Sequence, residues 1–222
     1  MKLKARATAV AAALLALGAG AVQAATTNGF ANGGFEIVGA TTPAASWLQA
    51  ANGYSLSSEA RTGSFSAQLA SAAFGAAVMV QNSVEQGGLA PLTAGDTPTL
   101  TFWAKGDAGT TGNVLFALRY LDSVGVIKAN SGNQFFQGNI NPNSWTQISY
   151  NLGAVPVGAT AAFIEFSQAI GPIGGGLSAG RVLIDDLYLG VAAPVPEPGT
   201  YGLMIAGLAA VGWMAKRRRT AA

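Results

Sequence analysis

The chain has 222 residues, of which 50% are hydrophobic and only 10% are charged, and it contains no Cys and no His. Because soluble domains usually carry charge on about a quarter of their residues, this composition indicates a surface rich in uncharged polar groups, a segment outside water, or both. The missing Cys excludes disulfides and thiolate metal sites. The missing His excludes the usual general base, the usual zinc ligand and the Ser-His-Asp triad.

The basic residues are concentrated at the two ends of the chain. Three of them, Lys2, Lys4 and Arg6, lie at the start, and four more occupy residues 216–219. Between residues 25 and 198 the chain has five basic and ten acidic residues, so this body carries a net charge of −5 although the whole chain is +2. A basic protein often binds nucleic acid, but here the body is acidic, and nucleic acid is not an expected partner.

Residues 1–24 have the three parts of a secretory signal peptide. The basic start is followed by an apolar Ala- and Leu-rich stretch and then by small residues up to Ala24. This order predicts an N-terminal signal helix that signal peptidase removes after Ala24. A buried Ala-rich helix or an uncleaved anchor is the alternative. Export would place the mature protein outside the cytoplasmic membrane.

The C-terminal end has a Pro-rich linker over residues 191–200, an apolar run over 201–215 and a basic tail over 216–222. With Gly199 and Thr200 the apolar run would extend about 26 Å as an α-helix, slightly less than the ~30 Å hydrocarbon core of a bilayer. The basic side chains that follow can reach the interface and hold that end in the cytoplasm. We therefore expect a single transmembrane helix with the body outside the inner membrane.

The body, residues 25–190, has the pattern of an all-β domain. Short runs of alternating polarity are separated by Gly, Asn, Ser and Asp clusters, as in a β-sandwich. Strands are expected at residues 34–38, 64–69, 77–81, 97–105, 113–121, 134–137, 145–152, 161–167 and 181–189. Period-two alternation predicts two inward faces, one with Leu100, Phe102 and Ala104, the other with Ile148, Tyr150 and Leu152.

The C-terminal segment over about residues 194–219 resembles the PEP-CTERM sorting domain of Gram-negative bacteria. The residues that carry the resemblance are Val195, Pro196, Glu197, Pro198, Lys216, Arg217, Arg218 and Arg219. The resemblance implies cleavage near Pro-Glu-Pro by exosortase, a membrane protease-transpeptidase, so that the helix is a removable anchor. The same tail is also called an ice-binding protein C-terminal domain, a name that refers to a sorting signal and does not imply ice binding. A plain single-span anchor is the alternative.

The body resembles the jelly-roll β-sandwich of carbohydrate-binding modules and galactose-binding-like domains. The matching segments, in order, are residues 32–36, Trp47, and residues 61–69, 92–96, 101–105, 143–146 and 182–189. The resemblance implies that the first and last strands are adjacent, which would bring Glu36 close to Asp185 and Asp186. In many relatives the equivalent carboxylates hold a structural Ca²⁺, an ion that needs six to eight oxygen ligands. Alternatively, Glu36 caps a turn and the two Asp side chains accept hydrogen bonds from nearby backbone donors.

Sugar binding would need aromatic rings on an open surface. Four aromatic residues are candidates for this carbohydrate-binding role, with Trp47 and Tyr54 preferred over Phe135 and Phe136, and a structural role is the alternative for each. Phe135 and Phe136 should point to opposite faces of one strand, so at most one is exposed. Trp103 and Trp145 are expected in the core.

Other activities find less support in the sequence. Thr97, Thr99 and Thr101 form one row of hydroxyls, too small for an ice-binding surface. The carboxylates that could act in catalysis are scattered among turns and strands: Asp96, Asp107, Asp122 and Glu165. A glycosidase needs two carboxylates at a defined separation, which no pair here indicates. The chain is therefore expected to be a non-enzymatic protein of the cell surface or extracellular matrix. The alternatives are a module that binds exopolysaccharide and, less favoured, a secreted glycan-active enzyme.

Overall fold

The computed structural model describes residues 28–70, 76–84, 88–106, 113–169, 180–190 and 207–208. Within these ranges the chain is almost entirely β-structure, with one short 3₁₀ helix at Gln137–Asn139. The first six strands are β1 Leu48–Ala51, β2 Ser55–Ser57, β3 Ser66–Ala70, β4 Ala77–Asn82, β5 Thr99–Gly106 and β6 Asn113–Leu121. The other five are β7 Ile127–Asn130, β8 Gln134–Phe135, β9 Thr146–Asn151, β10 Ala161–Ala169 and β11 Arg181–Gly190.

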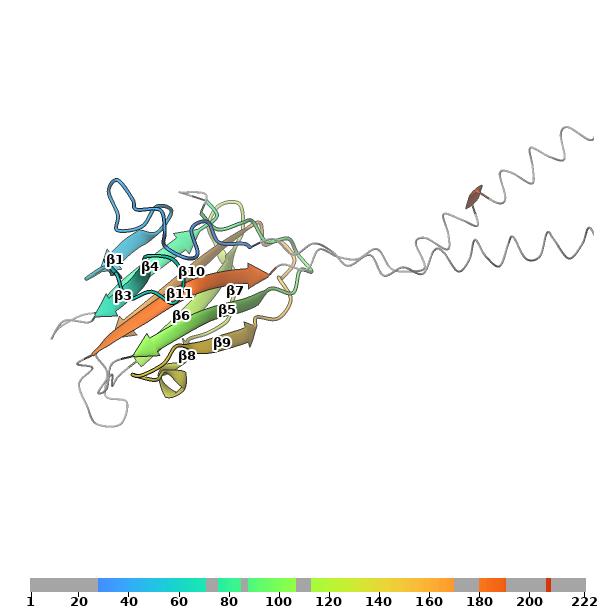
Figure 1. Ribbon diagram of the computed structural model, residues 1–222. Coiled ribbons are helices and arrows are strands. Elements are labelled where there is room, and N and C mark those ends of the chain that lie inside the picture. The colour runs from blue at the N-terminus through green and yellow to red at the C-terminus, as the bar shows by residue number, and fades with distance from the viewer. Residues whose placement is uncertain are drawn as a thin grey trace, which may run out of the picture. The chain divides into compact units, whose positions relative to one another are not determined.

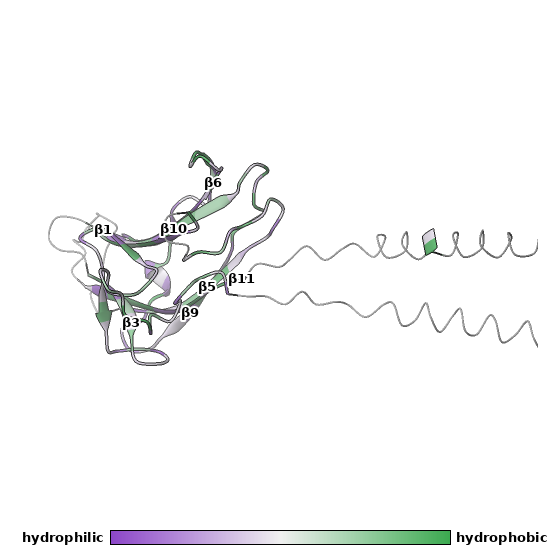
Figure 2. Ribbon diagram, turned by 90° about the horizontal axis from the view of Figure 1, so that it is seen from above, coloured by the Kyte–Doolittle hydropathy of each residue, from purple (hydrophilic) through white to green (hydrophobic). Residues whose placement is uncertain are grey.

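The strands form two antiparallel sheets (Figure 1). One sheet has the order β1-β4-β10-β6-β7, with β8 also paired to β6, and the other has the order β2-β3-β11-β5-β9. The view from above shows the two sheets as separate layers, with β10 and β6 in one and β5, β9 and β11 in the other (Figure 2). The chain crosses between the layers from β1 to β2, β3 to β4, β4 to β5, β5 to β6, β8 to β9, β9 to β10 and β10 to β11. The fold is thus the jelly-roll β-sandwich that the sequence predicts.

The core between the sheets is aromatic. Leu100, Phe102 and Ala104 of β5 are all fully buried, which confirms the predicted inward face of that strand. The ring of Phe102 makes edge-to-face contacts with Phe116 and Phe166 from the opposite sheet, at centroid distances of 6.1 and 5.3 Å. Such pairs add to the stabilisation that comes from burial alone. The second predicted face also holds, since Ile148 is buried while Tyr150 and Leu152 pack against the core.

The strands that the sequence pattern misses are short and exposed. β1, β2 and β7 have only three or four residues each and no buried face, so they leave no alternating pattern to detect. The strand expected at residues 34–38 is wrong. Phe35 has φ 59°, and the side chain of Asn32 both accepts from the Ile37 N–H and donates to its carbonyl, which bends the segment into a turn.

The N-terminal segment lies along the last strand. The Gly29 N–H donates to the Leu189 carbonyl at 2.8 Å, and the Leu187 N–H donates to the Gly33 carbonyl at 3.0 Å. Asn28 joins the two by donating to the Leu187 carbonyl and accepting from the Leu189 N–H. The first and last elements of the sandwich are therefore adjacent, as expected.

Contacts divide the chain into two units, one spanning Thr26–Ala192 and the other combining Met1–Ala25 with Ala193–Ala222. Nearly all of the second unit lies outside the described residues, including the predicted signal peptide, sorting motif and basic tail. Within it, residues 207 and 208 are helical. No helix in the described ranges is long and apolar enough to cross a bilayer.

Candidate functional site

Glu36 is bound to the loop that precedes β3. Its two carboxylate oxygens accept hydrogen bonds from the Ser64 N–H, at 3.0 and 2.9 Å, and one of them also accepts from the Phe65 N–H at 3.0 Å. Gly63 allows this close approach, because it has φ +68° and a methyl group on its Cα would collide with the Glu36 carboxylate. Glu36 therefore holds the loop over residues 61–65, which is part of the segment 61–69 that resembles jelly-roll domains in sequence.

Asp185 binds the same loop from β11. Its side chain is fully buried, and its Oδ2 accepts from the Arg61 N–H at 2.8 Å and the Thr62 N–H at 3.3 Å. The other oxygen accepts from the Asp186 N–H at 2.7 Å, where a β-bulge interrupts the pairing of β11 with β5. Burial raises the pKa of Asp185 to about 6, although these N–H donors oppose the rise.

Asp186 completes the cluster at the surface. Its Oδ2 forms an ion pair of 2.5 Å with the Arg61 guanidinium, and its Oδ1 accepts from the Thr62 hydroxyl at 2.5 Å. The guanidinium carbon of Arg61 also lies 3.8 Å from the ring centroid of Trp103, a distance typical of cation–π contact. We call Glu36, Asp185, Asp186 and the loop over residues 61–65 the carboxylate clasp.

The clasp brings together the three carboxylates that the sequence proposed as calcium ligands. A Cβ at Gly34 would lie 3.8 Å from Asp186 Oδ1 and 4.0 Å from Glu36 Cγ, so both side chains lie near this glycine. All three carboxylates, however, face N–H or O–H donors, whose positive ends repel a cation. Among the described residues, no group of three or more acidic, His or Cys side chains is placed to hold a metal. In this arrangement the residues fit the hydrogen-bonded alternative, and calcium stays a prediction.

The aromatic residues proposed for sugar stacking are placed in the core. Trp47 is 0% exposed, stacks on Phe30 at 5.6 Å and donates its indole N–H to the Asn32 carbonyl. Tyr54 is also buried, and its hydroxyl accepts from the Ala44 N–H at 3.0 Å. Neither ring presents a face to solvent, so the carbohydrate-binding assignment of Trp47 and Tyr54 is corrected to a core role.

The tryptophans expected in the core need the opposite correction. Trp103 and Trp145 are both only partly buried. Trp103 points out of its sheet because its neighbours Phe102 and Ala104 occupy the inward face of β5. The prediction for Phe135 and Phe136 is confirmed, since Phe136 is fully buried and Phe135 is 45% exposed.

The outer face of the six-stranded sheet carries a group of side chains of which the sequence named only Phe135 and Glu165, and those for separate reasons. Phe163 and Glu165 alternate with buried core residues of β10 and therefore point outward. Arg119 of β6 lies opposite Phe163 in the register. Its guanidinium forms a 2.7 Å ion pair with Glu165 and lies 5.3 Å from the ring centroid of Phe163.

The same face continues toward β8. Leu115 of β6 pairs with Ser167 on one side and with the exposed Phe135 on the other. Leu115 is only 7% exposed and Ala117 only 3%, although both alternate with core residues and point outward, so neighbouring side chains cover them. We call Arg119, Phe163, Glu165, Leu115 and Phe135 the outer-sheet patch. Only the pairing register brings these residues together, and this explains why the sequence alone did not reveal the patch.

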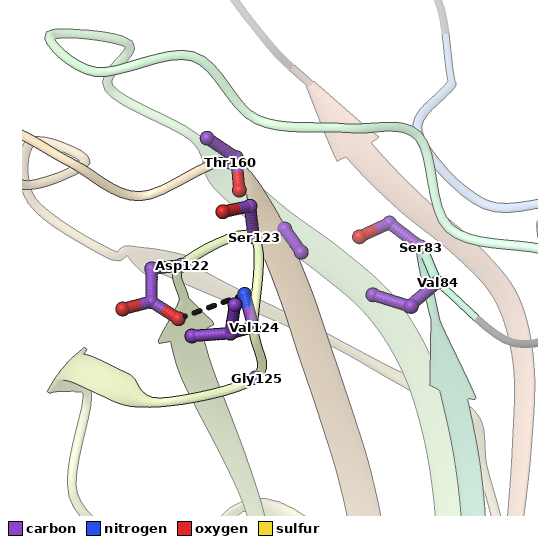
Figure 3. A pocket seen from close by; sticks show the side chains of 8 residues that line it. Ser83, Val84, Asp122, Ser123, Val124, Gly125 and Thr160 are labelled. Carbon is purple, nitrogen blue, oxygen red and sulfur yellow. Dashed lines mark hydrogen bonds between the residues drawn. The ribbon is translucent and has the colours of Figure 1, made fainter.

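A pocket of about 600 Å³ lies where the turn between β6 and β7 meets the end of β4 (Figure 3). Its lining is Ser83, Val84, Asp122, Ser123, Val124, Gly125, Thr160 and Ala161. Asp122 accepts from the N–H groups of Val124 and Val126 and pairs with Lys128 at 3.1 Å. The Val126 N–H bond is the main reason why the pKa of Asp122 lies below its usual range. Asp122 therefore stabilises the turn.

Two of the other scattered carboxylates also have structural partners. Asp96 accepts from the Thr93 N–H at 2.8 Å, and Glu165 is paired as described above. Asp107 lies outside the described residues.

Comparison of the sequence with protein families identifies the C-terminal segment. Residues 194–219 match the PEP-CTERM protein-sorting motif. This range includes all eight residues on which the resemblance rested, so the chain carries a PEP-CTERM sorting signal. No curated protein matches the sequence.

Comparison of the structure with solved structures concerns the sandwich. The enzymatically active domain of tailspike protein 4 from bacteriophage CBA120 matches with a TM-score of 0.53 and 20% identity, over 74% of this chain and 21% of that chain. The C-terminal family 22 carbohydrate-binding module of Clostridium thermocellum Xyn10B matches with a TM-score of 0.45 and 18% identity, over 77% of this chain and 99% of that chain. TmCBM61, solved with beta-1,4-galactotriose, matches with a TM-score of 0.43 and 17% identity, over 73% of this chain and 97% of that chain. At these identities the likeness is one of fold.

Proposed function

We propose that this protein is exported, held in the inner membrane by its C-terminal helix, and then released by exosortase to the cell surface or extracellular matrix. The observation that carries the proposal is the sorting motif at residues 194–219. Within it, Pro196, Glu197 and Pro198 stand two residues before the apolar run, and four basic residues stand immediately after it. Cytoplasmic basic residues fix the orientation of such a helix, and a removable anchor leaves no membrane span in the mature protein.

The intact mass of the protein recovered from the envelope and medium tests both cleavages together. We expect a chain that begins at residue 25 and lacks the residues beyond the Pro-Glu-Pro motif. Glu197→Ala should retain the C-terminal segment and stay in the membrane fraction. Thr200→Ala is the matched control, because this residue lies between the motif and the apolar run, and it should be processed normally. Equal processing of both variants, or recovery of the full chain from cytosol with its leader uncut, would contradict the proposal.

A second proposal concerns the body, which we infer binds an extended glycan on the outer-sheet patch without catalysis. Phe135 is 45% exposed, and Phe163 adds a second aromatic ring on the same sheet face, opposite Arg119, which lies four residues along β6 from the partner of Phe135. Binding sites of this kind are mainly apolar, with a few polar groups that orient the ligand. Arg119 and Glu165 supply such groups next to Phe163.

Affinity electrophoresis tests this second proposal, in gels that contain either exopolysaccharide from the bacterium that produces the protein or xylan. The wild-type protein should be retarded, and Phe135→Ala should lose most of the retardation because the exposed ring is removed. Val38→Ala is the control, since Val38 is similarly exposed, at 58%, and lies outside the patch. If Phe135→Ala migrates like the wild type, the patch is not the binding face. If no polysaccharide retards the wild type, the body is a structural domain.

A further inference from the structure

Exposed valines lie in three of the connections between strands. Val84 follows β4 and is 64% exposed, Val124 lies in the turn between β6 and β7 and is 81% exposed, and Val157 lies between β9 and β10 and is 92% exposed. Val126, in the same turn as Val124, is 55% exposed. Single exposed apolar residues are common, but a group of them indicates a contact surface. We call these four residues the valine end.

The three loops lie at the same end of the sandwich. The Ser83 N–H, beside Val84, donates to the Ala162 carbonyl at 3.0 Å, and the Thr160 N–H donates to the Leu121 carbonyl at 2.8 Å. These bonds attach the ends of β4 and β6 to the start of β10. Val84 and Val124 line opposite sides of the same pocket (Figure 3).

The chain leaves the sandwich at this end. Gly190, the last residue of β11, pairs with Thr99, the first residue of β5. The loop that carries Val157 is attached beside this pair, because the Leu152 N–H donates to the Pro98 carbonyl at 3.0 Å. In Figure 1 the arrowheads of β9 and β11 both point toward this end.

The length of the linker limits how far the valine end can be from the membrane. Residues 191–200 separate Gly190 from the apolar run that begins at Tyr201. Fully extended, such a segment spans about 35 Å at most. The anchored protein therefore keeps this end of the sandwich within about one domain diameter of the bilayer surface.

The charges of the turn that carries Val124 neutralise each other, since Asp122 pairs with Lys128.

We propose that the valine end rests on the outer leaflet of the lipid bilayer while the protein is anchored. This inference rests on the proposed membrane-anchored intermediate. Apolar side chains on short loops can enter the interface between headgroups and acyl chains, and the affinity grows with the apolar area that is buried. A short tether supplies a high effective concentration, so a weak contact suffices.

The absence of Cys from the chain makes a direct test practical. Full-length protein with a single cysteine at Val124→Cys or Val157→Cys is labelled with the fluorophore NBD and reconstituted into phosphatidylcholine vesicles. Ala70→Cys is the control. Ala70 is exposed and pairs with Arg181, the first residue of β11, so it lies at the opposite end of the strand from Gly190. Spin-labelled headgroups should quench the probes at 124 and 157 about twofold more than the probe at 70, because only the former reach the interface.

Flotation of the vesicles distinguishes failure of the proposed membrane anchor from failure of the proposed lipid contact. If the protein floats with the vesicles but the three probes are quenched equally, the contact is overturned and the anchor stands. If the protein does not float, both are overturned. If probes at 124 self-quench without spin label and the protein sediments as a dimer, the valine end binds a second copy and the lipid contact is overturned.

Discussion

Asp185 combines full burial with three N–H donors to its carboxylate, two from the loop over residues 61–65 and one from its own strand. The donors favour the ionised form, whereas desolvation favours the neutral form. Desolvation is the larger effect, and it raises the pKa of Asp185 to about 6.

This shift predicts a pH dependence of stability. An unfolded Asp has a pKa near 3.9, so between about pH 4 and 6 the folded state binds more protons than the unfolded state. The contribution of Asp185 to the free energy of unfolding is thus fully present below about pH 4 and lost as the pH rises through about 6. From the pKa difference, the loss is of the order of 3 kcal/mol.

Urea titrations of wild type and Asp185→Asn between pH 4 and 7.5 measure the effect. The difference between the two proteins isolates Asp185, because Glu59 and Asp122, whose pKa values are lowered, titrate in both. The wild type should lose stability relative to the variant as the pH rises. A difference that stays constant with pH would contradict the raised pKa.

Gly63 offers a second test at the residue scale. A methyl group there would meet the Glu36 carboxylate, and φ +68° is unfavourable for any residue with a Cβ. Gly63→Ala should lower the free energy of unfolding by more than about 2 kcal/mol, since strain and collision act together. Gly132→Ala is the control, because Gly132 has φ +67° with nothing within 4 Å of an added Cβ. If Gly63→Ala and Gly132→Ala lower the free energy of unfolding equally, the close approach of Gly63 to the Glu36 carboxylate does not contribute to stability.

At the scale of elements, the N-terminal segment behaves as an additional partner of β11. Gly33 lies so close to β11 that a Cβ would collide with the Leu187 carbonyl. We expect Gly33→Ala to separate the segment from the strand and so to speed hydrogen exchange at Leu187, whose amide donates to the Gly33 carbonyl. The Leu183 amide, toward the other end of β11, should keep its protection. Unchanged exchange at Leu187 would mean that the segment is not held by this contact.

Among the elements, the sequence predicts those strands whose side chains alternate between a buried and an exposed face. Strands with one fully buried face, such as β5 and β6, were recovered within two residues at each end. The turn at residues 34–38 was missed because its side chains alternate as in a strand, whereas its backbone is set by the positive φ of Phe35. The approach of Glu36 to Asp185 and Asp186 was predictable from the family resemblance, but their hydrogen bonds to the loop over residues 61–65 were not. The outer-sheet patch was not, because strand register depends on contacts between residues far apart in sequence.

At the scale of the whole molecule, the carboxylate clasp joins three distant parts of the chain. Glu36 comes from the N-terminal segment, Ser64 from the loop before β3, and Asp185 from the final strand. Closing such long loops costs chain entropy, which the clasp must offset with interactions that form only in the fold. Either hydrogen bonds alone or a bound calcium ion could provide them, and these two hypotheses differ in what removal of calcium would do.

Because the loop donors already face the clasp carboxylates, we expect the protein to melt at the same temperature in EGTA and in millimolar calcium. A ligand that binds only the folded state raises stability by about 2.7 kcal/mol at one hundred times its dissociation constant, which would shift the midpoint by several degrees. Differential scanning calorimetry resolves such a shift. Magnesium at the same concentration controls for ionic strength. A calcium-specific rise that Glu36→Gln abolishes would establish the predicted metal site, and it would show that the loop rearranges to offer carbonyl oxygens in place of its N–H groups.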